Sequence, residues 1–241
     1  MSESATAPLV EVRGIQKAYG GLRPLRIRRL DLGPGQNLAL VGFDRAAAEA
    51  FVNLVTGATV PDVGDVRVFG QPTTAITDAD AWLRSLDRFG IVSERAVLVE
   101  GLTGLQNLAM PLTLEVDPPA DAVRAQVMQL AVEVGIDTGD LGRPVAELSP
   151  ITRLRVRLGR ALALGPLVLL AEHPNASLSA AEAPVFAADF AALAAARGVA
   201  SITLTADRRF AAAVADEILV LQPATGELKP AAGWRRWFGE R

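Results

Sequence analysis

Residues 37 to 57, NLALVGFDRAAAEAFVNLVTG, contain the feature that most constrains the fold. An apolar run leads through Gly42 and a polar turn into an alanine-rich amphipathic segment. Apolar residues at successive positions indicate a strand covered on both faces, as in a parallel sheet. Residues 45–56 are expected to form a helix whose first amides are capped by Asp44. This is the layout of a strand, a phosphate-binding loop and a helix, yet the turn contains no Lys, Ser or Thr.

Strands and helices alternate along most of the chain. Residues 9–15 and 25–32 alternate apolar and polar side chains, which predicts half-buried strands. Further strands are expected at 61–70, 89–94, 166–172, 199–206 and 216–223, and further helices at 79–87, 120–134, 150–164 and 180–197. This alternation favours an α/β fold with a parallel sheet. Because residues 95–164 show little strand signal, we expect an inserted helical lobe there.

Composition narrows the classes of function. A chain of 241 residues, 50% of them hydrophobic, is long enough for one large domain with a buried core. Its net charge of -3 gives no basis for a nucleic-acid partner. The absence of Cys excludes disulfides, thiolate metal ligands and a Cys nucleophile. Residues 1–10 show no signal-peptide pattern, and no apolar run approaches the ~20 residues of a membrane span, so we expect a cytoplasmic protein.

The last residues, GWRRWFGER (233–241), combine Trp and Arg. One hypothesis is a loosely held, solvent-exposed end. The other is that the aromatic and basic groups dock onto a partner or a membrane interface. We predict one domain across 1–241, with an α/β core at about 9–94 and 165–223, a helical lobe at about 95–164 and a tail at 224–241.

Six segments, in order and spacing, resemble the ATP-binding subunit of ABC (ATP-binding cassette) transporters. VEVRGIQKAYGG resembles the first strand and adenine-stacking loop, with Tyr19 at the aromatic position. NLALVGFDRAAAEAFVNLVTGATVPDVGDVRVFG is similar to the phosphate-loop region, FGIVSE to the strand before the Q-loop, VAELSPITRLRVRLGRALALGP to the signature helix, LVLLAEHPNASLS to the Walker B strand and D-loop, and LTAD (204–207) to the switch-histidine strand. The resemblance implies a P-loop NTPase-like α/β domain with an antiparallel β-subdomain and an inserted helical lobe.

A working phosphate loop, G-x-x-x-x-G-K-[ST], needs Lys for the phosphates and a hydroxyl for Mg²⁺. Gly42 is retained, but Ala48 stands at the Lys position and Glu49 at the first hydroxyl position. Glu49 would repel a phosphate by about 4 kcal/mol at ~4 Å and an effective dielectric near 20. Arg45 could replace part of the missing Lys charge. Asp44 and Glu49 are expected to satisfy the helix N-terminus in place of a nucleotide.

The family's other site positions are replaced as well. The resemblance assigns Glu94 to the Q-loop Gln, Ser149 with Pro150 and Ile151 to the signature, Glu172 to the Walker B Asp, His173 to the general-base Glu, Ser179 to the D-loop acid and Ala206 to the switch His. His173 could accept a proton near pH 7, but the hypothesis we favour is a hydrogen-bonded histidine at the end of a buried strand. A metal site from Glu49, Glu94, Glu172 and His173 is conceivable. We predict no metal site and name no catalytic residue.

The resemblance therefore favours a pseudo-ATPase, with enzymatic activity left open. It would act as a structural or regulatory partner of a membrane permease or of an active ATPase subunit, docking through the groove between core and helical lobe. The family dimerises, so a second copy or a homologous subunit is an expected partner at the cytoplasmic membrane face. ATP and Mg²⁺ are expected as cofactors only if the altered site still binds them. Two alternatives are an ATP-hydrolysing ABC subunit with atypical motifs and a scaffold outside transport.

Overall fold

The computed structural model describes residues 7–231. Its larger sheet has the strand order β10-β9-β3-β8-β7-β6. In chain order these strands are β3 (Asn37–Val41), β6 (Phe89–Val92), β7 (Val168–Glu172), β8 (Ala200–Leu204), β9 (Glu217–Gln222) and β10 (Glu227–Pro230). All neighbours run parallel except β10, which pairs antiparallel with β9. The carboxyl ends of the parallel strands therefore meet at one edge of the sheet.

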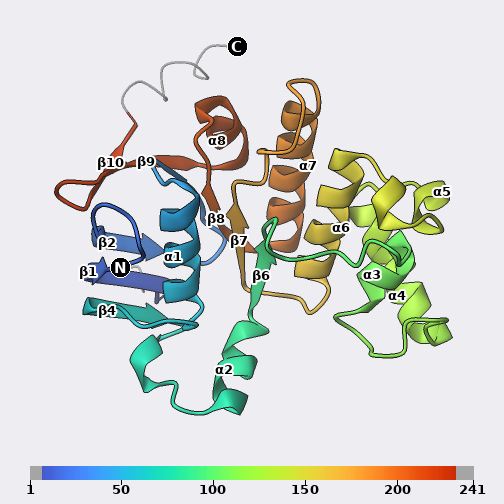
Figure 1. Ribbon diagram of the computed structural model, residues 1–241, viewed down its shortest axis with the longest axis horizontal. Coiled ribbons are helices and arrows are strands. Elements are labelled where there is room, and N and C mark those ends of the chain that lie inside the picture. Colours follow the sequence, from blue (N-terminus) through green and yellow to red (C-terminus); the bar gives the residue numbers. More distant parts are fainter. Residues whose placement is uncertain (1–6, 232–241) are drawn as a thin grey trace, which may run out of the picture.

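A smaller antiparallel sheet has the order β2-β1-β4-β5. Its strands are β1 (Val10–Lys17), β2 (Leu25–Leu32), β4 (Val63–Val68) and β5 (Gln71–Pro72). Helix α1 (Arg45–Val55) lies between the two sheets (Figure 1) and shares one buried cluster with both. Phe51 and Leu54 of α1 are fully buried in it, and burial of such a side chain stabilises the fold by about 1.5–3 kcal/mol.

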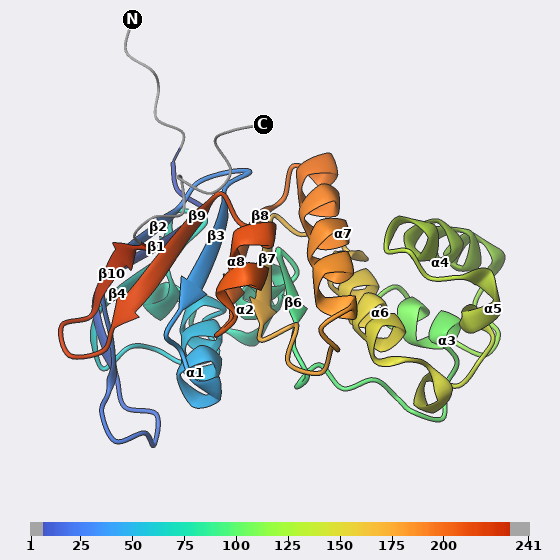
Figure 2. The same ribbon diagram turned by 90° about the horizontal axis from the view of Figure 1, so that it is seen from above.

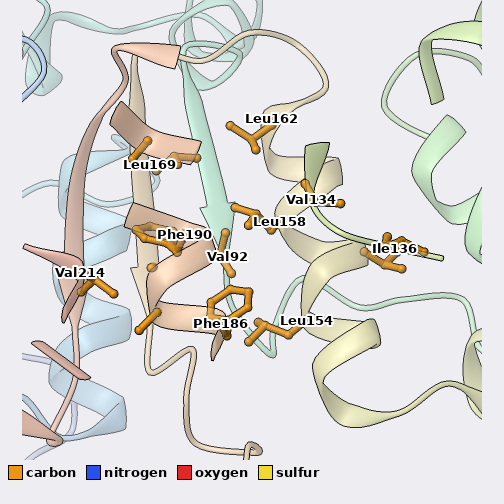
Figure 3. Packing of buried hydrophobic residues seen from close by; sticks show 14 of the residues in the cluster. Val92, Val134, Ile136, Leu154, Leu158, Leu162, Leu169, Phe186, Phe190 and Val214 are labelled. Atoms are coloured by element: carbon orange, nitrogen blue, oxygen red, sulfur yellow. The ribbon is translucent and has the colours of Figure 1, made fainter. Parts of the chain in front are cut away.

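The opposite face of the larger sheet packs against α7 (Glu182–Arg197) and α8 (Arg208–Val214), which form a second buried cluster. This cluster continues into the helical region between β6 and β7. Figure 3 shows Phe186 and Phe190 of α7 in one buried cluster with Val92 of β6 and with Leu158 of α6 (Pro150–Leu162). One continuous core therefore joins the sheet to the helical lobe.

The lobe consists of α3 (Gly104–Ala109), α4 (Asp121–Glu133), α5 (Thr138–Leu141) and α6 (Pro150–Leu162). Figures 1 and 2 both place α3, α4 and α5 at the end of the molecule far from β1 and β2. Helix α6 connects the lobe to the sheet by lying directly against β6. A Cβ added at Gly90 of β6 would lie 2.4 Å from the carbonyl oxygen of Ala161, so this close approach requires glycine. A further helix, α2 (Ala79–Leu86), precedes β6.

The α/β fold with an antiparallel subdomain and an inserted helical region is confirmed. The predicted tail from residue 224 is wrong at its start, because β10 extends the larger sheet. The four residues of β10, ELKP, are too few to give an alternating pattern. The short helices α3, α5 and α8 were not predicted, since four to seven residues give little periodicity. The expectations for residues 233–241 concern a segment outside the described residues.

Two short 3₁₀ turns complete the secondary structure, at Thr73–Ala75 and Val145–Glu147. None of the helices between residues 7 and 231 is long and apolar enough to cross a membrane.

Candidate functional site

The turn between β3 and α1 is short and closed. Gly42 has φ of 97°, a left-handed conformation that favours glycine, and a Cβ there would lie 3.3 Å from the carbonyl oxygen of Leu221. Phe43 points into the core, where its ring meets Phe51 edge-to-face at 5.8 Å. The turn is therefore anchored by an apolar side chain at its second residue.

Asp44 satisfies the start of α1, as the sequence predicts. Its Oδ1 accepts the backbone N–H of Ala47 at 2.7 Å, and its carbonyl oxygen accepts that of Ala48 at 2.9 Å. The side chain of Ala48 is completely buried. The expectation that Glu49 also caps this helix end is wrong, because its carboxylate faces Arg95 instead. Glu49 lies one turn into the helix, where the backbone amides already have helical partners.

Arg95 is the centre of an ion-pair network. Its Nη2 donates to Oε2 of Glu172 at 2.7 Å, and its Nε lies 3.3 and 3.2 Å from the two carboxylate oxygens. Its Nη1 lies 3.4 Å from Oε1 of Glu49. The side chain of Glu172 is only 8% exposed, so this carboxylate depends on Arg95 for compensation. Burial opposes the charge of Arg95, but the hydrogen bonds and charges of its partners raise its pKa overall.

A second ion pair lies in the same region. Nη1 of Arg45 lies 3.4 Å from Oε2 of Glu94, with both side chains well exposed. Arg45 begins α1 and Glu94 follows β6, so the two pairs join α1 to the ends of β6 and β7. One hollow brings together five of the candidate site residues from the sequence analysis with three others. The five are Arg45, Glu49, Glu94, Glu172 and His173, and the others are Ala46, Ser93 and Arg95.

His173 follows β7 in a left-handed conformation, with φ of 44°. Its N–H donates to the carbonyl oxygen of Leu204 at 2.8 Å, which fixes the backbone. The Nε2 atom is buried and has no hydrogen-bond partner within the described part of the chain. The side-chain hydrogen bond expected for His173 is therefore not seen at Nε2. The hypothetical four-residue metal site is not supported either, since no group of three or more candidate ligands forms between residues 7 and 231.

Tyr19 lies in the loop after β1 and packs against the core cluster around α1. Burial, and to a lesser extent the charge of Asp44, raises its pKa above the ordinary value. A Cβ added at Gly21 would lie 2.7 Å from the tyrosine ring, so the loop folds closely around this side chain. The tyrosine is therefore close enough to Asp44, the cap of α1, for that carboxylate to contribute to its raised pKa.

The start of α6 is capped within the chain. Oγ of Ser149 accepts the N–H of Thr152 at 3.2 Å and lies 2.9 Å from its hydroxyl. Pro150 at the first helical position has no N–H to offer. Ala206 follows β8 and is exposed, and the next residue, Asp207, caps α8. Neither Ser149 nor Ala206 lines the hollow around Arg95.

Sequence reasoning did not find Arg95. The one available signal was an Arg immediately after Glu94, beyond a buried strand. That signal does not reveal which of three carboxylates from separate segments the side chain would meet. The pairing is a product of how the strand ends converge.

The parallel sheet, the β3–turn–α1 unit, the antiparallel subdomain and the helical lobe between β6 and β7 together define an ATP-binding cassette fold. No family model matches the chain. Its relatives in sequence include the methionine import ATP-binding protein MetN of Brucella abortus (strain 2308), 27% identical over 218 residues, which covers 90% of this chain and 58% of MetN.

Two further relatives are transport proteins. The pyoverdine export ATP-binding/permease protein PvdT of Pseudomonas entomophila is 31% identical over 86% of this chain and 32% of PvdT. The phosphonates import ATP-binding protein PhnC of Anaeromyxobacter dehalogenans is 34% identical over 80% of this chain and 39% of PhnC. The chain thus spans only part of the length of the relatives it matches.

Solved structures agree with this fold. The ATP-binding cassette MJ0796, a dimer bound to ADP and Pi, has a TM-score of 0.75 at 20% identity, over 92% of this chain and 97% of that one. The cbiO1 protein of Clostridium perfringens has a TM-score of 0.80 at 18% identity, over 97% and 92%. The chain is an ABC cassette by fold and a relative of ABC transporter ATP-binding subunits by sequence.

Proposed function

We propose that this cassette does not hydrolyse ATP and acts as a structural or regulatory partner of a membrane permease or of an active ATPase subunit. The observation that carries the proposal is the guanidinium of Arg95 lying across Glu172 and reaching Glu49. By its place in the family pattern, Glu172 would hold Mg²⁺. A cation from the chain itself already contacts both oxygens of that carboxylate.

The phosphate loop supports the same proposal. Ala48 supplies no charge, and its buried side chain faces the core rather than the hollow. Arg45, the candidate replacement for the missing Lys, faces Glu94 at 3.4 Å. The amide of Ala47, which a phosphate would need, already donates to Asp44. An empty loop is therefore satisfied by the chain's own groups.

The cost of opening the Arg95–Glu172 ion pair gives the scale on which we expect ATP binding to be weakened. Opening the Arg95–Glu172 pair costs about 1–3 kcal/mol, after allowing for the partial exposure of Arg95. That alone lowers an affinity by roughly 5- to 150-fold. The pairing with Arg95 offsets part of the repulsion between Glu49 and a phosphate, and the missing Lys removes attraction in addition. We therefore expect no saturable ATP binding at ordinary millimolar concentrations.

The transport role follows from the relatives, whose names specify import of methionine, import of phosphonates and export of pyoverdine. Their substrates differ, so we assign none to this chain. As a partner subunit it would sit at the cytoplasmic face of the membrane, beside a permease and a second cassette. That second cassette is either another copy or an active homologue. No nucleic-acid partner is proposed.

Isothermal titration with ATP and Mg²⁺, paired with steady-state phosphate release, tests the proposal. We expect no binding heat and background turnover. The Ala48→Lys/Glu49→Ser double variant is expected to remain inactive, because the Arg95–Glu172 pair and the altered α6 start persist. An active cassette run in parallel checks the assay. Phosphate release above background by the unmodified chain would overturn the proposal, and micromolar ATP binding would contradict the expected loss of nucleotide affinity.

One observation favours a second candidate, an ATPase with unorthodox residues. Nε2 of His173 is unpartnered within residues 7–231, and His173 lines the hollow at the position of the family's general base. This candidate predicts phosphate release that disappears in His173→Ala and in Glu172→Ala. The proposed pseudo-ATPase predicts background release in all three proteins.

A further inference from the structure

A second hollow, which we call the α2 hollow, lies between α2 and the antiparallel subdomain and has a volume of about 360 Å³. It shares no residue with the hollow around Arg95, and none of its residues belongs to α6 or to the helical lobe. Sites for small molecules measure about 300–1,000 Å³ and combine apolar walls with a few polar groups. The apolar walls here are Val68, Phe69, Ile76 and Ala81, and the polar groups are Gln71, Arg84, Ser85 and Arg88.

The four polar side chains of the α2 hollow all carry hydrogen-bond donors. None of these side chains forms a hydrogen bond to another group between residues 7 and 231. The acids on or beside α2 do not neutralise the two guanidinium groups: Asp78 caps the start of the helix, and Asp80 and Asp87 pair with neither arginine. Within the described residues, two positive charges therefore line this hollow without a counter-ion.

Arg88 is held in place from two sides. Its guanidinium carbon lies 3.7 Å from the centre of the Phe69 ring, a cation–π contact, and that ring packs against Phe89 with centroids 4.9 Å apart. The carbonyl oxygen of Arg88 accepts the N–H of Leu167 at 2.8 Å. Phe69 has φ of 52°, a left-handed conformation that is rare for a bulky residue and is typical of functional sites. The Arg88 guanidinium therefore has a defined place before any ligand binds.

The end of a helix explains only part of this arrangement. Cations are favoured near the carboxyl end of a helix, and Arg84 lies in the last turn of α2. Arg88, however, lies beyond α2 and over an aromatic ring that follows β4, and Gln71 comes from β5. Like charges four positions apart also weaken a helix. Donors thus converge from separate elements, which the helix dipole does not require.

We propose that the α2 hollow binds a small phosphate monoester, with its phosphoryl oxygens held by Arg84 and Arg88 and its organic part against Val68 and Ile76. Guanidinium forks match phosphate oxygens in bidentate pairs. Two forks, a hydroxyl and an amide suit the three free oxygens of a phosphate monoester better than the two oxygens of a carboxylate. The site goes beyond the pseudo-ATPase proposal, since it uses none of the residues on which that proposal rests.

A ligand in this hollow would connect α2 to the antiparallel subdomain. No residue of α2 is buried, and the indole N–H of Trp82 donates to the carbonyl oxygen of Thr56 at 3.0 Å. A phosphoryl group shared by Arg84 on the helix and Arg88 over Phe69 would add a second connection. Because a ligand that binds only the folded chain stabilises it, the melting temperature is expected to rise with ligand concentration.

The test uses the full chain with phenyl phosphate as the probe, and with inorganic phosphate and benzoate for comparison, at constant ionic strength. Amide chemical shifts report the location, and the titration gives the affinity. We expect phenyl phosphate to bind at least about 5-fold more tightly than inorganic phosphate, which has no apolar part, and than benzoate, which has one oxygen fewer. Shifts are expected at residues 68–71 and 81–88 and not at residues 42–49.

Variants assign the binding to the two arginines. Arg84→Gln/Arg88→Gln is expected to weaken binding by about 20-fold or more. Arg208→Gln/Arg209→Gln removes the same charge from two exposed residues at the start of α8 and is expected to bind like the unmodified chain. If the first pair unfolds because Phe69 loses its cover, Arg84→Gln alone, at an exposed side chain, is expected to weaken binding by about 3-fold or more.

Several results would overturn the proposal. They are no binding at millimolar phenyl phosphate, equally tight binding of inorganic phosphate or benzoate, shifts confined to residues 42–49, and equal losses in the two double variants. Vesicles that contain phosphatidate present the same phosphate group on a lipid surface, and binding to them without binding of the soluble ester would also overturn it. Phosphate release from ATP would refute the pseudo-ATPase proposal and leave the phenyl phosphate result unaffected.

Discussion

Arg95 and Glu172 form a partly buried ion pair, with Nη2 2.7 Å from Oε2, that ties the segment after β6 to the end of β7. The carboxylate is 8% exposed while the arginine is 40% exposed. Water therefore reaches the cation but scarcely the anion. Glu172 is therefore the member of the pair that needs a counter-ion.

Replacement of Arg95 by Met is expected to lower the free energy of unfolding by about 1–3 kcal/mol, because Glu172 loses its counter-ion. Adding Glu172→Leu is expected to restore most of the loss, since an apolar pair needs no compensation. Urea denaturation of the single and double variants measures both changes. Arg84→Met, at an exposed arginine without an ion pair in the described chain, serves as control and is expected to change stability by less than about 0.5 kcal/mol. Equal losses in the single and double variants would contradict the pairing.

The Asp44 cap gives a second prediction. Asp44→Ala removes the acceptor that lies 2.7 Å from the amide of Ala47 and is expected to cost about 1 kcal/mol. For a chain of this size that corresponds to a fall in Tm of about 2–4 °C. Asp44→Ser retains a capping oxygen and is expected to melt close to the unmodified protein. A thermal scan in which the Ala variant melts no earlier than the Ser variant would show that the loop is not self-capped.

The contact between β6 and α6 gives a third. Gly90→Ala would place Cβ 2.4 Å from the carbonyl oxygen of Ala161 and 2.6 Å from Cδ2 of Leu169. Since α6 must shift away from the sheet, we expect a loss of about 1–3 kcal/mol in urea denaturation. Gly139→Ala is the matched control, because nothing lies within 4 Å of its added Cβ. Equal stability of the two variants would argue against tight α6–β6 packing.

Asp31 gives a prediction for pH. Burial alone would raise its pKa, but hydrogen bonds and charges from Arg29 and Arg13 bring the pKa below its ordinary value. A carboxyl whose folded pKa is lowered stabilises the fold above its unfolded pKa, about 3.9, and loses this effect as pH falls through the folded value. Because the site is partly exposed, we expect no more than about 1 kcal/mol.

Urea denaturation from about pH 7 down to about pH 2 measures this effect. The stability gap between the unmodified chain and Asp31→Asn is expected to be present at neutral pH and to close in acid. Arg13→Gln/Arg29→Gln, which removes the donors, is expected to abolish the same pH-dependent component. A gap that stays constant with pH would rule out ionisation of Asp31 as its cause.

Much of the fold could be predicted because its elements have strong local patterns. The continuous apolar run at 37–41, the alternation at 25–32 and the helically spaced apolar residues of 121–133 are each patterns that identify the element from the sequence alone. Strand β10 could not be predicted in this way. It has four residues, of which only Leu228 has a partly buried apolar side chain, and they form a strand by pairing with the edge of β9.

For the candidate site, too, one part could be predicted from the sequence and another part could not. The residues at the positions that the resemblance assigns to the family's site, such as Ala48 and Glu172, were available from the sequence. The partners of these residues were not, because an ion pair depends on where long side chains from distant segments converge. Glu49 illustrates the difference: its charge was predicted to serve the helix end, and its position along the helix gives it to Arg95 instead.

By itself the sequence determined the α/β cassette and the strand–turn–helix unit at Gly42, and it predicted altered residues at the positions that the family resemblance assigns to the site. Only the tertiary structure decided that Glu94 faces Arg45 and that Glu49 and Glu172 face Arg95. The physical reason is the distance along the sequence over which each kind of interaction acts. Periodicity and capping act between residues a few positions apart, whereas charge compensation acts between whichever groups the packed elements bring within about 4 Å.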